Sequence, residues 1–197
     1  MPDAARHYAD HNATSPLRPA ALAAMTAALG EVGNPSSVHA EGRAARARVE
    51  AARADVAALA GAEPQHVVFT SGASEAAATA LTPALGDKLI VFAGEHPCVA
   101  AGGRFLPEAT RAAPCDGQGR IDLHALAAMI DGPVVLALQA ANSETGVIQP
   151  VAEAAALVHA RGGVVICDAV QAAGRIAFGL ETWGADWALV SAHKLGG

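Results

Sequence analysis

Five short apolar runs, rich in β-branched residues, predict β-strands along the chain. They are HVVFT at 66–70, KLIVF at 88–92, VVLAL at 134–138, VVIC at 164–167 and WALV at 187–190. Their apolar positions are consecutive rather than alternating, which is typical of strands that are covered on both faces. A helical pattern at 38–61 precedes the first run and another at 151–163 lies between two runs, and the second ends in a Gly pair that indicates a helix stop. The pattern predicts an α/β fold, with a mostly parallel sheet and helices on both faces.

The composition and net charge limit the kinds of partner that the chain is expected to bind. The chain has 197 residues, enough for one domain with a full core, and its net charge of −6 provides no basic surface for nucleic acid or an anionic membrane. It contains neither a leader pattern nor an apolar run of roughly 18 residues, so we expect a cytoplasmic protein without membrane partners. Cys98, Cys115 and Cys167 are widely spaced, and this spacing indicates neither a disulfide framework nor a metal site.

Polar residues follow every predicted strand. In parallel sheets, ligands bind beyond the carboxyl ends of the strands, so these residues are expected to share one site. In chain order, the candidates are Thr70, Ser71, Ala73, Ser74 and Glu75; Glu95 and His96; Asn142, Ser143 and Glu144; Asp168 and Gln171; and Ser191, His193 and Lys194.

The segment TSGASE at 70–75 has the form of a glycine turn that leads into a helix. Free N–H groups at the start of the helix, with the hydroxyls of Ser71 and Ser74, would bind a phosphate. The alternative is a plain helix cap, with Ser71 as the capping residue and Ser74 or Glu75 completing it.

Three ionisable residues carry the candidate chemistry. Asp168 follows a buried strand, where a carboxylate needs a cation such as a pyridinium nitrogen, an Arg, a Lys or a metal ion, or serves as a cap. Lys194 provides an amine that can form a covalent bond with a carbonyl, and its alternative is a solvated loop lysine. His96 can stack on a flat ring or transfer protons, and its alternative is a hydrogen-bonded loop histidine. Together with the phosphate site, they match the needs of pyridoxal phosphate (PLP).

The chain also resembles the cysteine desulfurases and, more broadly, the class V aminotransferase family of PLP-dependent enzymes with fold type I. The resemblance rests on seven stretches in family order: 8–19, 33–46, 67–76, 94–99, 141–150, 165–176 and 191–197. It implies that residues 1–16 form an N-terminal arm and that residues 17–197 form the N-terminal portion of the PLP-binding large domain. The rest of that domain and a small C-terminal domain would lie outside this chain.

The resemblance implies a role for each site residue. Lys194 would bond covalently to the cofactor and move protons, Asp168 would hold the pyridine nitrogen protonated, and His96 would stack on the ring and assist proton transfer. Asn142 and Gln171 would lie near the phenolic oxygen of the ring. Four residues would hold the phosphate, and they are Ala73, Ser74, Ser191 and His193.

The implied reaction releases sulfur from L-cysteine as an enzyme persulfide, with L-alanine as product, as in the supply of sulfur for iron–sulfur cluster assembly. The expected partners are L-cysteine, a sulfur-acceptor protein and a second copy in a homodimer. The alternatives are another class V enzyme, such as a selenocysteine lyase or a small-substrate aminotransferase, and a non-catalytic remnant or a half that a partner completes.

Overall fold

The structure, a computed structural model, describes residues 7–197 and contains one five-stranded sheet. The strand order is β2-β1-β3-β4-β5, and every neighbouring pair is parallel. The strands are β1 (Leu89–Phe92), β2 (Thr110–Ala113), β3 (Val135–Gln139), β4 (Val164–Asp168) and β5 (Trp187–Leu189). The predicted parallel sheet is confirmed.

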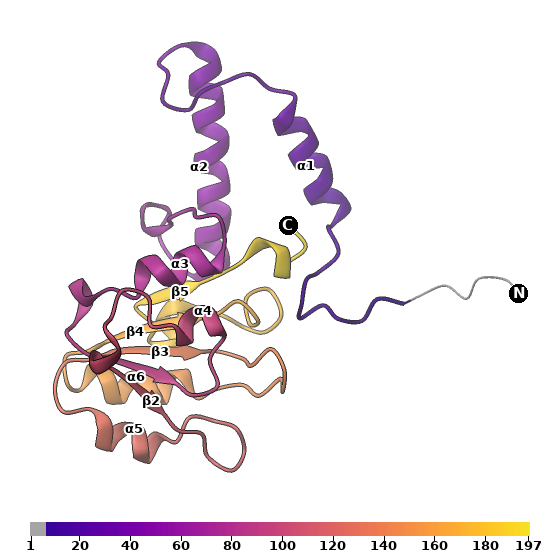
Figure 1. The fold of residues 1–197 in the computed structure, drawn as a ribbon. Coiled ribbons are helices and arrows are strands. Elements are labelled where there is room, and N and C mark those ends of the chain that lie inside the picture. The colour runs from indigo at the N-terminus through magenta and orange to yellow at the C-terminus, as the bar shows by residue number, and fades with distance from the viewer. Residues whose placement is uncertain (1–6) are drawn as a thin grey trace, which may run out of the picture.

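Helices cover both faces of the sheet, as the continuous apolar runs predict (Figure 1). One face packs against α3 (Ala73–Ala80) and α4 (Pro97–Ala100), and the other against α5 (Leu123–Met129) and α6 (Val151–His159). Because successive strand residues point to opposite faces, Val135 and Ala137 belong to the core beneath α3, whereas Leu136 and Leu138 belong to the core beneath α6. A one-turn helix, α7 (Leu180–Trp183), precedes β5.

Two helices, α1 (Pro19–Leu29) and α2 (Ala40–Ala60), extend away from the sheet (Figure 1). The long helix predicted at 38–61 is therefore confirmed. It begins after His39, whose side chain accepts a hydrogen bond from the Gly42 N–H, and it ends at Gly61 in the left-handed conformation that glycine adopts without steric cost. Single 3-10 turns at Pro64–His66, Pro83–Leu85, Pro107–Ala109 and Ala192–Lys194 complete the elements.

The strand predicted at 66–70 is wrong. Residues 64–66 form a 3-10 turn and 67–70 run unpaired, with Val68 71% exposed. A strand requires backbone partners, and within the described residues none lies beside this segment. Conversely, β2 is a strand that the pattern missed: TRAA places only Ala113 in the core, because it lies at the edge of the sheet.

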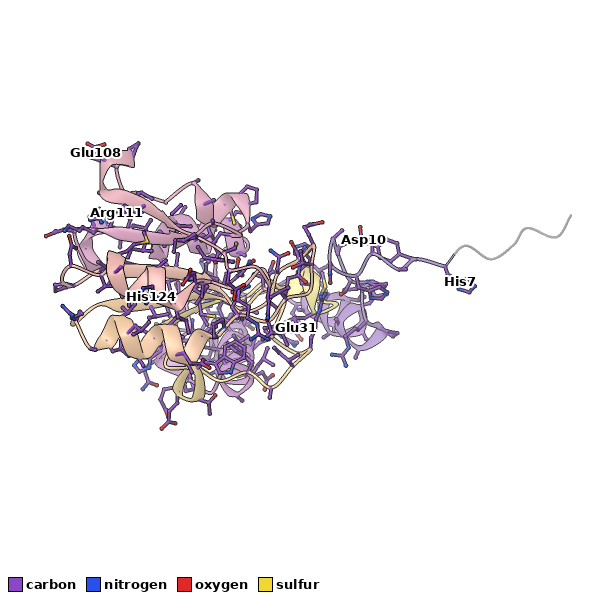
Figure 2. The ribbon with its side chains drawn as sticks, turned by 90° about the horizontal axis from the view of Figure 1, so that it is seen from below. His7, Asp10, Glu31, Glu108, Arg111 and His124 are labelled. Atoms are coloured by element: carbon purple, nitrogen blue, oxygen red, sulfur yellow. The ribbon has the colours of Figure 1, made fainter. Side chains whose placement is uncertain are left out.

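The N-terminal segment reaches back to the end of the chain. The Ser15 N–H donates to the His193 carbonyl and the Arg18 N–H to the Gly196 carbonyl, both at 2.9 Å. Figure 2 shows His7 and Asp10 on this projecting segment, far from Glu108 and Arg111. Residues 1–6 of the predicted arm lie outside the described residues, and the division into arm and large-domain portion stays a prediction. Within residues 7–197, no helix is long and apolar enough to cross a membrane.

Candidate active site

A cavity of about 500 Å³ opens at the carboxyl ends of the strands. Eight of the nine residues to which the resemblance assigns a role line this cavity, together with Ala13 from the N-terminal segment. Those eight are Ala73, Ser74, His96, Asp168, Gln171, Ser191, His193 and Lys194. The expected convergence at the strand ends is thus present in the structure.

The start of α3 forms one wall. Gly72 precedes its first residue and no side chain caps the helix, so the alternative in which Ser71 is the capping residue does not hold. Instead, the Ser71 N–H donates to the Glu75 carboxylate at 2.6 Å, and this bond lowers the pKa of Glu75. Ala73 and Ser74 line the cavity at a helix N-terminus whose leading N–H groups lack a side-chain acceptor. This wall suits an anion.

Asp168 ends β4 beside Gln139 of β3 and is only 8% exposed. Its Oδ1 accepts the Val170 N–H at 2.9 Å, a local bond that accounts for one oxygen. Burial raises the pKa of this carboxyl, against the opposing effect of the Val170 N–H and of His96 and Lys194. None of the ion pairs within residues 7–197 includes Asp168. A buried carboxylate facing a cavity without an ion-pair partner fits a pyridinium nitrogen.

Lys194 lies in the 3-10 turn after β5 and is half-buried, unlike a solvated loop lysine. Its Nζ donates a hydrogen bond to the backbone carbonyl of Asn12, in the N-terminal segment. The neighbouring His193 places Nδ1 3.2 Å from the Thr14 hydroxyl. The N-terminal segment therefore holds the candidate reactive amine at the edge of the cavity.

His96 precedes α4, and its Nδ1 accepts the Cys98 N–H at 3.2 Å. The Cys98 Sγ lies 2.9 Å from the same nitrogen. Since an acceptor nitrogen carries no proton, the neutral ring holds its proton on Nε2. Burial raises the pKa of the Cys98 thiol, despite a hydrogen bond from Ser74 that lowers it, and a thiol held protonated is a weak nucleophile.

Asn142 is the one residue of these nine that does not line the cavity, and the strand-end candidates Thr70, Glu95 and Glu144 do not line it either. Its Nδ2 donates to the Gly94 carbonyl at 3.1 Å, and its Oδ1 accepts the N–H groups of Glu144 and Thr145 at 2.9 Å each. These bonds shape the loop after β3. The roles of Asn142 and Gln171 near a bound ring stay predictions.

Sequence reasoning missed several residues that line the cavity, among them Gln139, Cys98 and Ala13. Gln139 lines the cavity, and its Nε2 donates to the Gly94 carbonyl at 2.7 Å. The rule that polar residues at strand ends face the site would have found it, because it directly follows the run VVLAL. Ala13 had no such signal, since it reaches the site only through long-range contacts of the N-terminal segment.

The parallel sheet and the cavity at its carboxyl edge define the large-domain architecture of fold type I enzymes. The family model described as Aminotransferase class-V matches residues 7–197, and the chain belongs to this family. Members of the family are generally PLP-dependent.

Individual relatives agree with this assignment. The chain is 40% identical over 204 residues to a cysteine desulfurase of Cereibacter sphaeroides, with 98% of this chain and 53% of the relative covered. It is 38% identical over 212 residues to a cysteine desulfurase of Frankia sp. (strain EuIK1), with 96% and 50% covered. A solved structure titled NifS-like protein superposes with a TM-score of 0.91 at 32% identity, covering 98% of this chain and 57% of the other. The chain spans about half the length of the curated relatives it matches.

Proposed function

We propose that this chain is the cofactor-binding part of a PLP-dependent cysteine desulfurase. The observation that carries the proposal is the convergence of Lys194, Asp168, His96 and the start of α3 on one cavity. Identities of 37–40% to proteins named cysteine desulfurase support the substrate class. A structure titled SspA in complex with cysteine, 25% identical with a TM-score of 0.88, supports it further.

Each residue has a task that its surroundings suit. The helix start at Ala73 and Ser74, with Ser191 and His193, would hold the phosphate, and Asp168 would hold a proton on the pyridine nitrogen. When bound, PLP supplies an electron sink for bonds at the α-carbon and β-carbon of an amino acid.

Proton movement falls to two residues. Lys194 Nζ, once it leaves the Asn12 carbonyl, would bond to the cofactor and then carry protons at the amino-acid substrate. His96 presents its Nε2–H as a donor, because Nδ1 is occupied by the Cys98 amide. Residues that would accept sulfur as a persulfide are not assigned to this chain. The proposal further includes a partner protein that accepts the sulfur, assembly of the protein as a homodimer, and a location in the cytoplasm.

The covalent bond between Lys194 and the cofactor can be tested directly, because Lys88 and Lys194 are the only two lysines in the sequence. Purified protein is mixed with PLP, reduced with borohydride and digested, and the modified peptide is located by mass spectrometry. We expect the label on Lys194, lost in K194A and kept in K88R. Lys88 is bound to Asp131 at 2.8 Å at the start of β1, so it is a matched control. A label on both lysines alike would contradict a built cofactor site.

Substrate class is tested separately by incubating the PLP-loaded protein with L-cysteine and a thiol reductant. Alanine and sulfide formed in equal amounts, and absent in K194A, would support the desulfurase. Amino transfer to a keto acid, or turnover of selenocysteine alone, would assign a different class V activity. Labelling of Lys194 without any turnover would support binding without catalysis.

A further inference from the structure

A second carboxyl, that of the half-buried Glu95, lies next to the candidate site without a role in the proposed chemistry. It lies in the loop between β1 and α4 and directly precedes His96. Its Oε1 accepts the backbone N–H of Gln139, the residue that pairs with Asp168 across β3 and β4. Its Oε2 is buried and has no hydrogen-bond partner.

These contacts determine where a proton on Glu95 resides. Oε1 receives an N–H, so the proton of the neutral acid is on Oε2. An ionised oxygen without a donor is costly in a buried position, whereas a hydroxyl there costs much less. Burial, with repulsion from Asp168, raises the pKa of Glu95 to about 8, and the backbone N–H groups of Gln139 and His96 oppose this rise.

Several titratable groups lie around Glu95. Charge repulsion couples Glu95 to the Asp168 carboxyl, and a charged Glu95 raises the pKa of the Cys98 and Cys167 thiols. The potential cations are His96, the next residue in the chain, and Lys194, and both act on Asp168. None of the ion pairs in the described part of the chain involves Glu95. A cation that enters the cavity and pairs with Asp168 would add an opposite charge close to Glu95.

We propose that Glu95 is a positioning residue that acts through Asp168: it stays a neutral acid while the cavity is free, and it releases its proton when a cationic ring pairs with Asp168. The inference rests on the proposed function for the identity of that ring. In the step, the Oε2–H bond breaks, its electron pair stays on the carboxylate and the proton goes to solvent. By linkage, an ionised Glu95 binds the cationic ring more tightly than a neutral one.

The first test needs no cofactor. Carbon-13 NMR of glutamate carboxyls in the free protein should contain one resonance that is absent from E95Q and titrates well above the others. In D168N that resonance should titrate at lower pH, since one negative charge is gone. E153Q, a substitution of an exposed glutamate on α6, should leave it unchanged. A Glu95 resonance that titrates with the ordinary glutamates would overturn the proposal.

The second test measures protons on binding of pyridoxine 5′-phosphate, which has the ring and the phosphate but no aldehyde. Calorimetry near pH 8 in buffers of different ionisation enthalpy gives the protons released per ligand. We expect more protons to be released per bound ligand by wild type and E153Q than by E95Q. The affinity for the ligand should also rise with pH across this range, more steeply in wild type than in E95Q.

The two tests separate the possible failures. Equal proton release from wild type and E95Q, with normal binding, would overturn the role of Glu95 and leave the proposed function standing. No binding by any variant would contradict the proposed function, while the NMR titration would still decide the charge state of Glu95. If E95Q fails to fold, the one glutamate resonance that titrates above the others, shifted in D168N and unshifted in E153Q, provides the same decision.

Discussion

Arg175 ties the N-terminal segment to the site, and its removal should release that segment. Its Nη1 donates to the Asn12 Oδ1 and to the Gln171 Oε1, both at 2.6 Å. Its Nη2 donates to the carbonyls of His11 at 2.8 Å and of Lys194 at 3.3 Å. One guanidinium thus connects the segment that holds Lys194 Nζ with the loop that carries Lys194.

The magnitude follows from the bonds lost in R175A. Two of the four, those to His11 and Asn12, hold the N-terminal segment directly. Arg175 is exposed, so each bond contributes about 0.5–1 kcal/mol net, near the lower end of the usual range. Local opening of the segment should then become easier by about 1–2 kcal/mol, which is a factor of about 5–30 in the opening equilibrium.

Hydrogen exchange of the Ser15 amide measures this equilibrium, because that amide is bonded to the His193 carbonyl while the segment is closed. We expect exchange about 5–30 times faster in R175A than in wild type. R175K should be intermediate, since one ammonium cannot reproduce the planar fork. R161A, a substitution of an exposed arginine beyond α6, is the matched control. A change below about twofold in R175A, or an equal change in R161A, would refute the reasoning.

Three further predictions concern stability and protonation. Because the folded-state pKa of Glu95 is raised from 4.5 to about 8, its contribution to stability is complete below pH 4.5 and is lost as pH rises through 8. The free energy of unfolding in wild type should fall over that window relative to E95Q, by at most about 5 kcal/mol, in denaturant titrations at several pH values. G163A should lower the unfolding free energy by about 1–3 kcal/mol in the same assay, since its Cβ would lie 2.4 Å from the Val134 carbonyl oxygen; an unchanged midpoint would show that the loop yields freely. In nitrogen-15 NMR, the neutral His96 ring should carry its proton on Nε2 in wild type and in C98A, because the Cys98 amide remains as donor. A ring protonated on Nδ1 in either protein would contradict the assignment.

Local sequence was a good guide wherever burial alone decides structure. Four of the five predicted strands are present, because continuous apolar runs have no stable position except between two helical layers. The run at 66–70 is just as apolar, yet it is unpaired, because a strand also needs a neighbour. The edge strand β2 was missed for the opposite reason, since pairing with β1 forms it with little burial.

The candidate site likewise has features that the sequence predicted and features that only the folded structure shows. The parallel order of the strands brings their carboxyl ends together, so the sequence by itself placed eight residues, from Ala73 to Lys194, in one cavity, although Asn142 lies outside it and Gln139 was missed. Only the tertiary structure decided that Asn12 holds Lys194, that the Cys98 amide selects the His96 tautomer, and that Glu95 faces Asp168. Such contacts depend on distances and burial that arise when remote segments pack, and protonation follows from burial and from the charges nearby.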